Sequence, residues 1–582
     1  MSASGPPIGI APEAGATGTP GAPGGSPSPA VAATAARQGA LGLIGAISAG
    51  AGGLVLTVTV SRLLPARDAG IYFTAVALFT IATSVLMLGA DTGLVRALSG
   101  LRAARRPELI RPVLAGALRP VIVVSVAVAL AVALGAQPLA QLLFPAETAD
   151  RMAGVLRLLA PFLVLSTTSM VLLNGAARGL GSLRTFTTVQ QVFLPVSRPL
   201  LLAATVLAGG LLVDRDVELP STATLAVAAW ALPLLVAALL AVREVRRLVR
   251  LRTAGDGTAA TGSPAESPAG SPEGADQLPA EHGVRAFWRH TAPRGVAATF
   301  EVLIVWADVV LVTALLGAAP AAVYAAASRF VTSGTFALQA VRLSVGPLLA
   351  AAFARNDHVE AESVHRLSVR WAVLSTWPVY LALAIFAPGV LSILGPHFAS
   401  AATTLALLSI AMLAVVTTGN ANTVLNMARH STWAAMNTGA AIVVMLSLDL
   451  LLVPRLGILG AGIGWSAAML TDALAGTIEI RRGLGLHSMD GAALRTGLTV
   501  LLAFGVPAFA IRTAFQVGGT TTPAVVVLLV GGLVATGCYL AALVAQRVQL
   551  GLDELVGALR RRPAASARPA IPVQRPTEGR SA

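Results

Sequence analysis

Charged residues inside long apolar stretches are the part of this sequence best able to bind or move charge. Arg198 lies halfway along one such stretch, within the segment Pro-Val-Ser-Arg-Pro at 195–199. Two prolines around an arginine interrupt the backbone hydrogen-bond ladder, and irregular backbone inside a membrane must lie against protein or water. An arginine in that setting can bind a diphosphate group through two parallel hydrogen bonds. We therefore predict that Arg198 lines a substrate-binding cavity.

A second group of charges has helical spacing. Arg294, Glu301 and Asp308 are seven residues apart, so a helix places them on one face at successive depths. The hairpin that follows gives residues equidistant from its turn the same depth. This predicts an ion pair between Asp308 and Arg329, and it places Arg294 level with Arg342 near the membrane interface. We expect Arg294, Arg329 and Arg342 to line the substrate cavity. Glu301 and Asp308 are expected to take part in ion coupling or in ion pairs. The alternative is that these charges form interhelical pairs that only fix helix packing.

Polar residues in other apolar stretches are further candidates. Asp472 lies seven residues before Glu479, and we expect Asp472 to take part in ion coupling or in an interhelical ion pair. Asn174 and Asn426 are expected as polar side chains of the cavity, with packing hydrogen bonds as the alternative. The histidines and the acids near them have no spacing that fits a zinc motif, and no metal ligand or catalytic residue is predicted.

The composition indicates which kind of protein positions these charges. The chain has 582 residues, of which 55% are hydrophobic and 12% charged, and its mean hydropathy is +0.77. Soluble proteins carry about 25% charged residues, so an ordinary soluble enzyme is excluded. A single cysteine, Cys538, excludes a disulfide framework. The net charge of +14 fits membrane topology better than nucleic-acid binding. We predict an all-α, multi-pass membrane protein that binds no nucleic acid.

Apolar windows of about 20 residues, the length that crosses a membrane, divide the chain into about fourteen predicted spans. The predicted segments are a disordered tail (1–36), a lobe of six spans (37–250), a disordered linker (251–284), a second lobe of six spans (285–482), two further spans (483–545) and a basic tail (546–582). The third span is expected at 115–136, the fourth at 155–176, the eighth at 321–350 and the eleventh at 433–453.

Arginine is unevenly distributed between the predicted loops. The loops that follow even-numbered spans are rich in arginine, as at residues 243–252, whereas the loop after the fifth span carries Asp214, Asp216 and Glu218. Basic loops remain on the cytoplasmic side of a membrane. Both termini and the linker are therefore predicted to be cytoplasmic, in a protein of the cytoplasmic membrane.

The sequence repeats itself at an offset of 252 residues. Tyr72 matches Tyr324 and Asn174 matches Asn426, and apolar residues around both pairs match in the same register. An even number of spans per copy gives both copies the same orientation. The repeat predicts two parallel six-helix lobes followed by two C-terminal helices, with a site at the lobe interface near the membrane midplane.

The first predicted hairpin resembles a known family. Gly-Ala-Leu-Gly-Leu-Ile-Gly at 39–45 and Ser-Arg-Leu-Leu-Pro-Ala-Arg-Asp-Ala-Gly-Ile-Tyr at 61–72 resemble the polysaccharide flippases. Their superfamily also contains multidrug-and-toxin extrusion transporters and lipid II flippases, and the resemblance covers roughly residues 37–545. It implies a two-lobed, alternating-access transporter that turns an undecaprenyl-diphosphate-linked sugar across the membrane. The lipid II flippase pattern of several arginines in the first two spans is not matched, because no charge lies between Arg37 and Arg62.

These features predict a flippase for polyprenyl-diphosphate-linked oligosaccharides rather than an enzyme. We expect a lipid-linked glycan and membrane lipids as partners, together with glycan polymerases or ligases. No cofactor is expected, and coupling to H⁺ or Na⁺ is left open. A multidrug exporter or a lipid II flippase of the same fold is the first alternative. A membrane glycosyltransferase is the second, because Asp214-Arg215-Asp216 has the form of a metal-binding motif, although such acids belong in the first outer loop of those enzymes.

Overall fold

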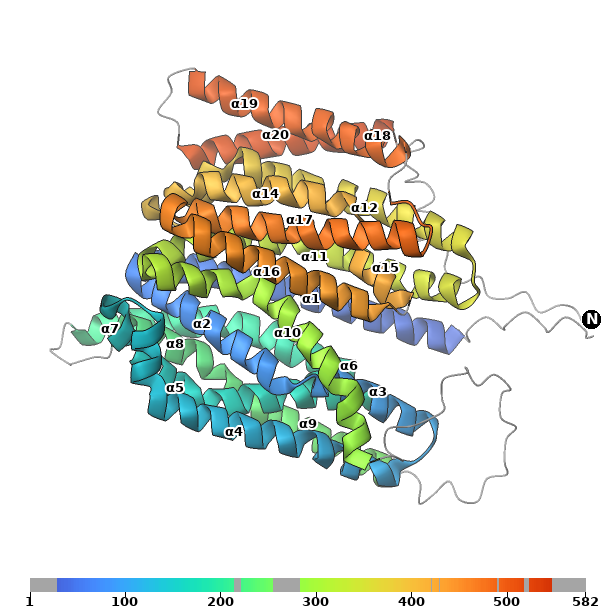
Figure 1. Ribbon diagram of the computed structural model, residues 1–582. Helices are drawn as coiled ribbons and strands as arrows, with labels where there is room; N and C mark the ends of the chain where they lie inside the picture. The colour runs from blue at the N-terminus through green and yellow to red at the C-terminus, as the bar shows by residue number, and fades with distance from the viewer. Residues whose placement is uncertain are drawn as a thin grey trace, which may run out of the picture.

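Long helices make up nearly all of the described chain. The computed structural model describes residues 29–213, 221–254, 283–419, 421–428, 430–488, 491–517 and 523–546, which contain helices and no strand. Fourteen helices in this part of the chain are long and apolar enough to cross a membrane, as the sequence predicts. They run side by side along a common axis (Figure 1). The predicted all-α, multi-pass membrane fold is confirmed.

The first half of the chain forms one bundle, which we call the N-lobe and which is the lower half of Figure 1. Short π-helical turns at Val171–Ala177 and Thr187–Phe193 interrupt two of its membrane helices. Its helices are α1 (Pro29–Leu63), α2 (Ala66–Met87), α3 (Ala90–Ala103), α4 (Ile110–Leu143), α5 (Ala146–Met170), α6 (Leu183–Phe186), α7 (Leu194–Val213), α8 (Thr222–Ala231) and α9 (Pro233–Ala254).

The second half forms the C-lobe and a separate layer outside it. Helices α18–α20 pack on the outer side of the C-lobe, at the top of Figure 1, away from the N-lobe. The C-lobe helices are α10 (Gly283–Leu316), α11 (Ala318–Ala354), α12 (His358–Ile385), α13 (Ala387–Ser392), α14 (Ala402–Thr417), α15 (Ala421–Met427), α16 (Ser431–Leu456) and α17 (Ile458–Gly483); the added helices are α18 (Gly491–Val500), α19 (Val506–Val517) and α20 (Ala524–Ala545).

Several helices extend beyond their predicted spans. The third span, predicted over 115–136, runs over Pro107–Leu143, and the eighth, predicted over 321–350, runs over Ala318–Ala354. Alanine, leucine and arginine favour helix equally well outside the apolar layer, so hydropathy alone underestimates helix length. Helix α1 begins at Pro29, so residues 29–36 are helical and not part of a disordered tail. Most of the predicted tails and linker, at 1–28, 255–282 and 547–582, lies outside the described residues.

The two lobes meet along α2, which packs against α10 and α11 as well as against α5 and α8 of its own lobe. Gly70 allows the closest approach, because a Cβ atom there would lie 1.7 Å from the carbonyl oxygen of Ala318. One turn further along α2, the hydroxyl oxygens of Thr74 and Thr313 are 2.5 Å apart. These contacts join the α1–α2 hairpin to the α10–α11 hairpin near their turns.

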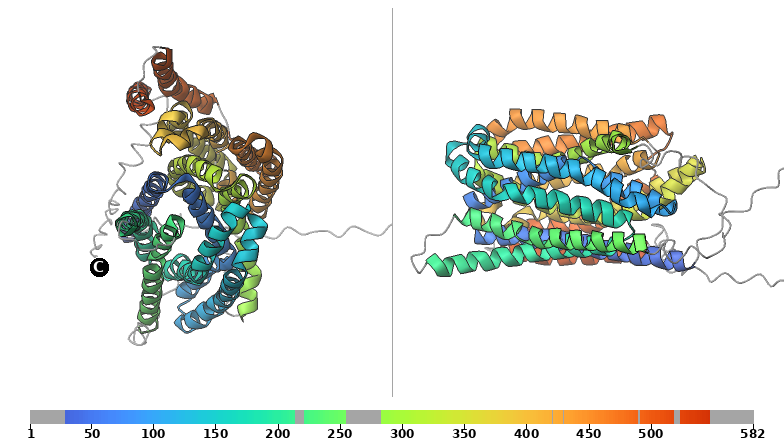
Figure 2. Two further views of the ribbon diagram at one scale, coloured as in Figure 1. Left: turned by 90° about the vertical axis from the view of Figure 1, so that its left-hand side faces the viewer. Right: turned by 90° about the horizontal axis from the view of Figure 1, so that it is seen from below.

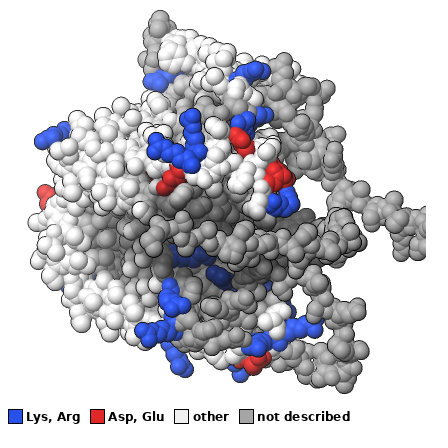
Figure 3. Space-filling model, turned by 45° about the vertical axis from the view of Figure 1, so that its right-hand side comes forward, with Lys and Arg blue, Asp and Glu red and all other residues white. Residues whose placement is uncertain are grey.

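The two ends of the helix bundle differ. At the end where the two hairpins turn, which we call the closed end, Arg62 of α1 donates a 2.6 Å hydrogen bond to the carbonyl oxygen of Ile393 in the C-lobe. At the opposite end, the Arg-rich end, basic residues lie in the last turns of α3, α9 and α17. Most of the long helices run the full distance between these two ends (Figure 2). Figure 3 looks toward the Arg-rich end and shows a hollow between the two halves, with basic side chains inside it.

Candidate functional site

Arg198 lies on α7 and packs against an aromatic ring of α8. Its guanidinium carbon lies 4.1 Å from the centre of the Trp230 ring, and its Nε donates to the backbone oxygen of Trp230 at 3.3 Å. Helix α7 is continuous through Pro199, so the helix is not interrupted at the two prolines as predicted. The irregular backbone lies elsewhere in the same membrane span. It lies one turn earlier, in the π-helical turn Thr187–Phe193, which accommodates the ring and the missing N–H of Pro195.

Arg329 lies on α11 and has a similar aromatic neighbour in the other lobe. Its guanidinium carbon lies 3.5 Å from the centre of the Trp306 ring of α10. Its Nη2 atom is buried and has no hydrogen-bond partner among the described residues. A buried guanidinium that keeps a free donor is costly unless another group, such as a ligand oxygen, accepts from it.

Tyr72 of α2 lies near both arginines. Its side chain is fully buried, and its hydroxyl lies within electrostatic range of both Arg198 and Arg329. The hydroxyl has no hydrogen-bond partner in the described part of the chain. The lobe interface therefore brings together three donor-bearing side chains from α2, α7 and α11, two of them cationic. A ligand with several anionic oxygens fits this set, because all three groups can donate to it.

Asp308 has a different partner from the one predicted. Its Oδ2 atom accepts a 2.5 Å hydrogen bond from the Tyr324 hydroxyl, and its Oδ1 atom accepts one of 2.7 Å from the backbone N–H of Val309. No direct ion pair joins Asp308 to Arg329 within the described ranges, although the two side chains lie within electrostatic range of each other. Tyr324 lies closer to the hairpin turn at Gly317 than Arg329 does, and it reaches the carboxylate first. Arg329 packs on Trp306 instead.

Glu301, Arg342 and Asp472 form a second charged group nearer the Arg-rich end. The three side chains lie within electrostatic range of one another, from α10, α11 and α17. Arg294 is exposed. The two acids are thus the charged neighbours of Arg342. Arg294, which was predicted at the same depth, is not among them. Opposite charges from three helices at one level stabilise one another within the membrane.

The asparagines have different surroundings and do not line one common cavity. Asn422 donates to Asp472 at 2.9 Å. Asn174 lies in a π-helical turn, where its Nδ2 atom is 3.6 Å from the sulfur of Met170 and its Oδ1 atom is buried without a partner in the described chain. Asn426, its counterpart in the repeat, is exposed on α15. The structure does not bring Asn174 and Asn426 to the three side chains between the lobes.

Asp449 of α16 is a buried acid that the sequence analysis missed. Its side chain is fully buried, neither carboxylate oxygen has a hydrogen-bond partner in the described residues, and it lies within electrostatic range of Tyr324 and Asp308. The signal was present, because Asp449 falls inside the predicted span 433–453 and an acid within a span deserves the same scrutiny as an arginine.

The fold and this site define an integral membrane protein of two helical lobes, with an arginine from each lobe near Tyr72 of α2, the helix along which the lobes meet. No family model matches the sequence, and no curated protein matches it either. The structure is similar to lipid II flippase MurJ in an inward closed conformation, with a TM-score of 0.64, 10% identity, and coverage of 87% of this chain and 98% of that one. It is also similar to a MATE family multidrug resistance transporter of the MOP superfamily in an inward-facing conformation, with a TM-score of 0.55, 15% identity, and coverage of 76% and 98%.

A third similar structure is a mutant of the Vibrio cholerae MATE transporter VcmN, with a TM-score of 0.50, 17% identity, and coverage of 81% of this chain and 98% of that one. All three similarities extend over almost the whole length of the compared transporter. The chain therefore has the fold of the MOP superfamily transporters, as the resemblance in the first hairpin predicted. Identities this low establish the fold alone, and the substrate must be argued from the site.

Proposed function

We propose that this protein is a transporter that flips a polyprenyl-diphosphate-linked oligosaccharide across the cytoplasmic membrane by alternating access. The observation that supports it most is that Arg198 and Arg329, one from each lobe, both lie within electrostatic range of the buried Tyr72 hydroxyl. A diphosphate offers several anionic oxygens, which two guanidinium groups and a hydroxyl can bind together. A substrate held by both lobes at once would link binding to their relative motion.

The surroundings of the two arginines suit a diphosphate. Trp230 and Trp306 cover one face of each guanidinium and leave its edge for hydrogen bonds. In this proposal the diphosphate lies between the lobes, the sugar occupies the hollow at the Arg-rich end, and the polyprenyl tail stays in lipid. Glycan polymerases or ligases would act on the product, and they are part of the same proposal.

Ion coupling is assigned, in this proposal, to the buried acids of the C-lobe. Asp308 and Asp449 lie within electrostatic range of each other, and two buried carboxylates are best accommodated when a proton or a Na⁺ ion neutralises part of their charge. Glu301 and Asp472 share Arg342, and Asp472 also accepts hydrogen bonds from Asn422 and Thr438, whereas both carboxylate oxygens of Asp449 have no partner among the described residues. We therefore rank Asp308 and Asp449 above them as the coupling pair.

The alternative substrates differ in charge. A multidrug exporter of the same fold would handle organic cations, and the two arginines near Tyr72 disfavour a cationic ligand there. A lipid II flippase stays a close alternative, because lipid II is itself a polyprenyl-diphosphate-linked sugar. The acids that suggested a glycosyltransferase, at 214–216, lie outside the described residues.

The proposed orientation places the Arg-rich end in the cytoplasm, since basic loops stay inside. Reporter fusions after Ala104, Leu248 and Arg562 should all report cytoplasm, and a fusion near Asp216 should report the outside. A signal from outside at Leu248 would reverse the orientation. Cysteine labelling with a membrane-impermeant reagent, at the same positions, checks the fusions.

Depletion of the protein in its own cells tests the proposed substrate class. We expect lipid-linked oligosaccharide to accumulate in the cytoplasmic leaflet, and the wild-type gene to clear it. Genes for Arg198→Ala and Arg329→Ala should not clear it, although both proteins reach the membrane. Arg482→Ala, which removes an exposed arginine far from the lobe interface, is the matched control and should behave as wild type. Depletion without accumulation of any lipid-linked sugar would refute the proposal.

A further inference from the structure

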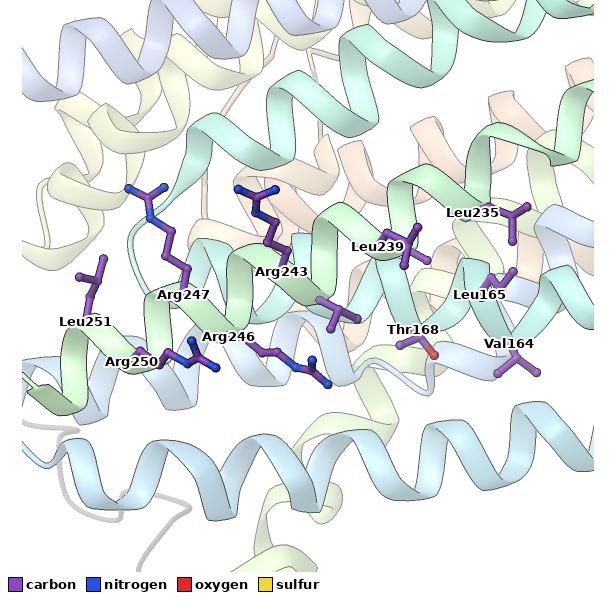
Figure 4. A pocket seen from close by; sticks show the side chains of 12 residues that line it. Val164, Leu165, Thr168, Leu235, Leu239, Arg243, Arg246, Arg247, Arg250 and Leu251 are labelled. Atoms are coloured by element: carbon purple, nitrogen blue, oxygen red, sulfur yellow. The ribbon is translucent and has the colours of Figure 1, made fainter.

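A second site candidate lies away from the lobe interface, on the flank of the N-lobe. Helices α5 and α9 line a groove of about 970 Å³ at the Arg-rich end. Its deeper part is apolar, with Val164 and Leu165 from α5 and Leu235 and Leu239 from α9 (Figure 4). Thr168 is the one uncharged polar residue among those lining it. This volume lies at the upper end of the range for ligand pockets of roughly 300–1,000 Å³.

The groove opens toward lipid. All the residues that line the groove belong to the N-lobe, and α9 packs against α5, α7 and α8 of the same lobe. Leu239 is 71% exposed and Leu235 is 41% exposed. Large apolar side chains that are exposed on a membrane-spanning helix contact acyl chains. The apolar part of the groove therefore lies in the hydrocarbon layer, and its basic part lies where that layer ends.

Four arginines of α9 line the part of this groove that is nearest the Arg-rich end. They are Arg243, Arg246, Arg247 and Arg250, spaced so that a helix presents them on one side. Arg247 forms a 3.6 Å ion pair with Glu244. Arg243 and Arg246 form no ion pair with any described residue, and both are exposed. An adjoining pocket of about 710 Å³ shares Leu251 and adds further arginines from α3 and the loop after it. The groove is thus strongly positive at one end and apolar at the other.

We infer that this groove binds an acidic phospholipid from the leaflet at the Arg-rich end. The phosphate would lie between Arg243 and Arg246, and the acyl chains would run along Leu235, Leu239 and Val164. Topology alone requires basic residues near the membrane, but it does not require four of them around a groove with an apolar floor. A basic pocket between membrane helices is a recognised arrangement for acidic headgroups. The inference does not depend on the proposed function, because the groove lies outside the lobe interface.

Lipid retention in defined bilayers tests the inference. The purified protein is placed in nanodiscs of dioleoylphosphatidylglycerol and dioleoylphosphatidylcholine, and native mass spectrometry counts the lipids that stay bound. Wild type should retain phosphatidylglycerol in preference to phosphatidylcholine. Arg243→Gln/Arg246→Gln should lose this preference by roughly tenfold or more, since each basic residue near a phosphate contributes about fivefold to binding. Arg481→Gln/Arg482→Gln removes two exposed arginines from α17 at the same end and should retain it.

A third variant separates a built groove from diffuse positive charge. Thr168→Trp fills the groove without changing any charge, so it should reduce retention of phosphatidylglycerol while the helix content and elution volume stay as in wild type. Equal retention of the two lipids by wild type would overturn the inference, as would equal losses in the two double-arginine variants. Full retention in Thr168→Trp would also overturn it. Displacement of phosphatidylglycerol by an equal amount of undecaprenyl diphosphate would assign the groove to the transported lipid and overturn the assignment to a phospholipid.

Discussion

The first hairpins of the two lobes are copies of one unit, yet the same tyrosine has a different role in each. Tyr324 of the α10–α11 hairpin donates to Asp308 at 2.5 Å. Tyr72 is its counterpart in the α1–α2 hairpin, but the counterpart of Asp308 there is Leu56, and the Tyr72 hydroxyl has no partner among the described residues. One copy uses the hydroxyl to hold a buried acid. The other copy leaves the hydroxyl without a partner in the described residues, within electrostatic range of two arginines.

The charges of the two lobes are also distributed differently. Arg329 lies within the second helix of its hairpin, where the N-lobe has Ala77. The N-lobe arginine, Arg198, comes from a later helix, and its counterpart in the C-lobe is Leu450, next to Asp449. The C-lobe thus combines acids with a base, whereas the N-lobe contributes only a base to the interface. The duplication preserved the packing of the hairpins, and substitution afterwards divided the roles between ion coupling and anion binding in our proposal.

Removal of either interface arginine should have the largest effect. Arg198→Ala or Arg329→Ala removes a charged partner of the diphosphate, which costs about 2–5 kcal/mol of binding free energy and lowers transport by about thirtyfold or more. Lysine at either position should restore transport only in part, because a compact ammonium lacks the planar guanidinium fork. Flipping of a fluorescent polyprenyl-diphosphate sugar in proteoliposomes measures both variants. Full activity of both alanine variants would remove these residues from the site.

A double variant sharpens the assignment of Arg329. If Arg329 only balanced Asp308, then Arg329→Ala with Asp308→Ala would recover transport, since both buried charges would be gone together. The hydrogen bond from Tyr324 to Asp308 indicates instead that this carboxylate is held without Arg329. We expect no recovery. Recovery to half of wild-type transport would show that Arg329 has a structural role and that the anion site needs another cation.

The paired tyrosines should separate stability from function. Tyr324→Phe leaves the buried Asp308 without its hydroxyl donor, and the loss of a hydrogen bond to a charged group costs about 1.5–3 kcal/mol of stability. Tyr72→Phe removes a hydroxyl that has no partner in the described chain, so stability should be unchanged while transport falls. Unfolding in mixed detergent micelles, followed by tryptophan fluorescence, measures the first effect. A Tyr72→Phe protein that is destabilised as much as Tyr324→Phe would contradict the comparison.

The features that could be predicted from the sequence are those that depend only on the order of residues along the chain. The number of spans follows from runs of apolar residues, and the repeat follows from the matches around Tyr72 and Tyr324. Arg198 and Arg329 were selected because a deep charge is rare, and the structure places both within electrostatic range of Tyr72. Whether they bind substrate stays a prediction.

Features that depend on helix rotation could not be predicted in this way. The partner of Asp308 is set by which residue of α11 faces α10, and a shift of a few residues along the hairpin decides between Tyr324 and Arg329. The groove of α5 and α9 could not be predicted from the sequence either. Its arginines belong to a basic cytoplasmic loop in the sequence, and membrane topology alone accounts for such a loop. Asp449, by contrast, could have been predicted, since the rule that a charge within a membrane span marks a candidate site applies to acids and arginines alike.

The contact between the two hairpins should be sensitive to one methyl group. Gly70→Ala places a Cβ against the carbonyl oxygen of Ala318, which cannot move aside as a flexible side chain could. Overpacking of this kind costs about 1–3 kcal/mol. We expect Gly70→Ala to weaken the closed end and to increase accessibility of a cysteine placed at position 318. Gly53→Ala on α1, where nothing lies within 4 Å of a new Cβ, is the control and should leave accessibility unchanged. The counterpart of Gly70 in the repeat is Ala322, so the tight approach belongs to one copy only.

The smallest effect concerns the hydroxyl pair that joins the lobes one turn away. The hydroxyl oxygens of Thr74 and Thr313 are 2.5 Å apart, and each lies 2.8 Å from a backbone oxygen of its own helix. Because each hydroxyl has one proton, one of them donates to the other and only the second donates to its own helix. Thr313→Val should therefore cost only about 0.5–1.5 kcal/mol, and Thr74→Val a similar amount. Both hydroxyls belong to one interaction, so the double variant should cost less than the sum of the single ones. The counterpart of Thr313 in the first lobe is Ser61, whose buried hydroxyl has no partner within the described residues, and Ser61→Ala should cost nothing measurable. Strictly additive costs for Thr74 and Thr313 would show that the lobes are joined here by packing alone, through the close approach of Gly70, and that the hydroxyl pair contributes nothing to the closed end.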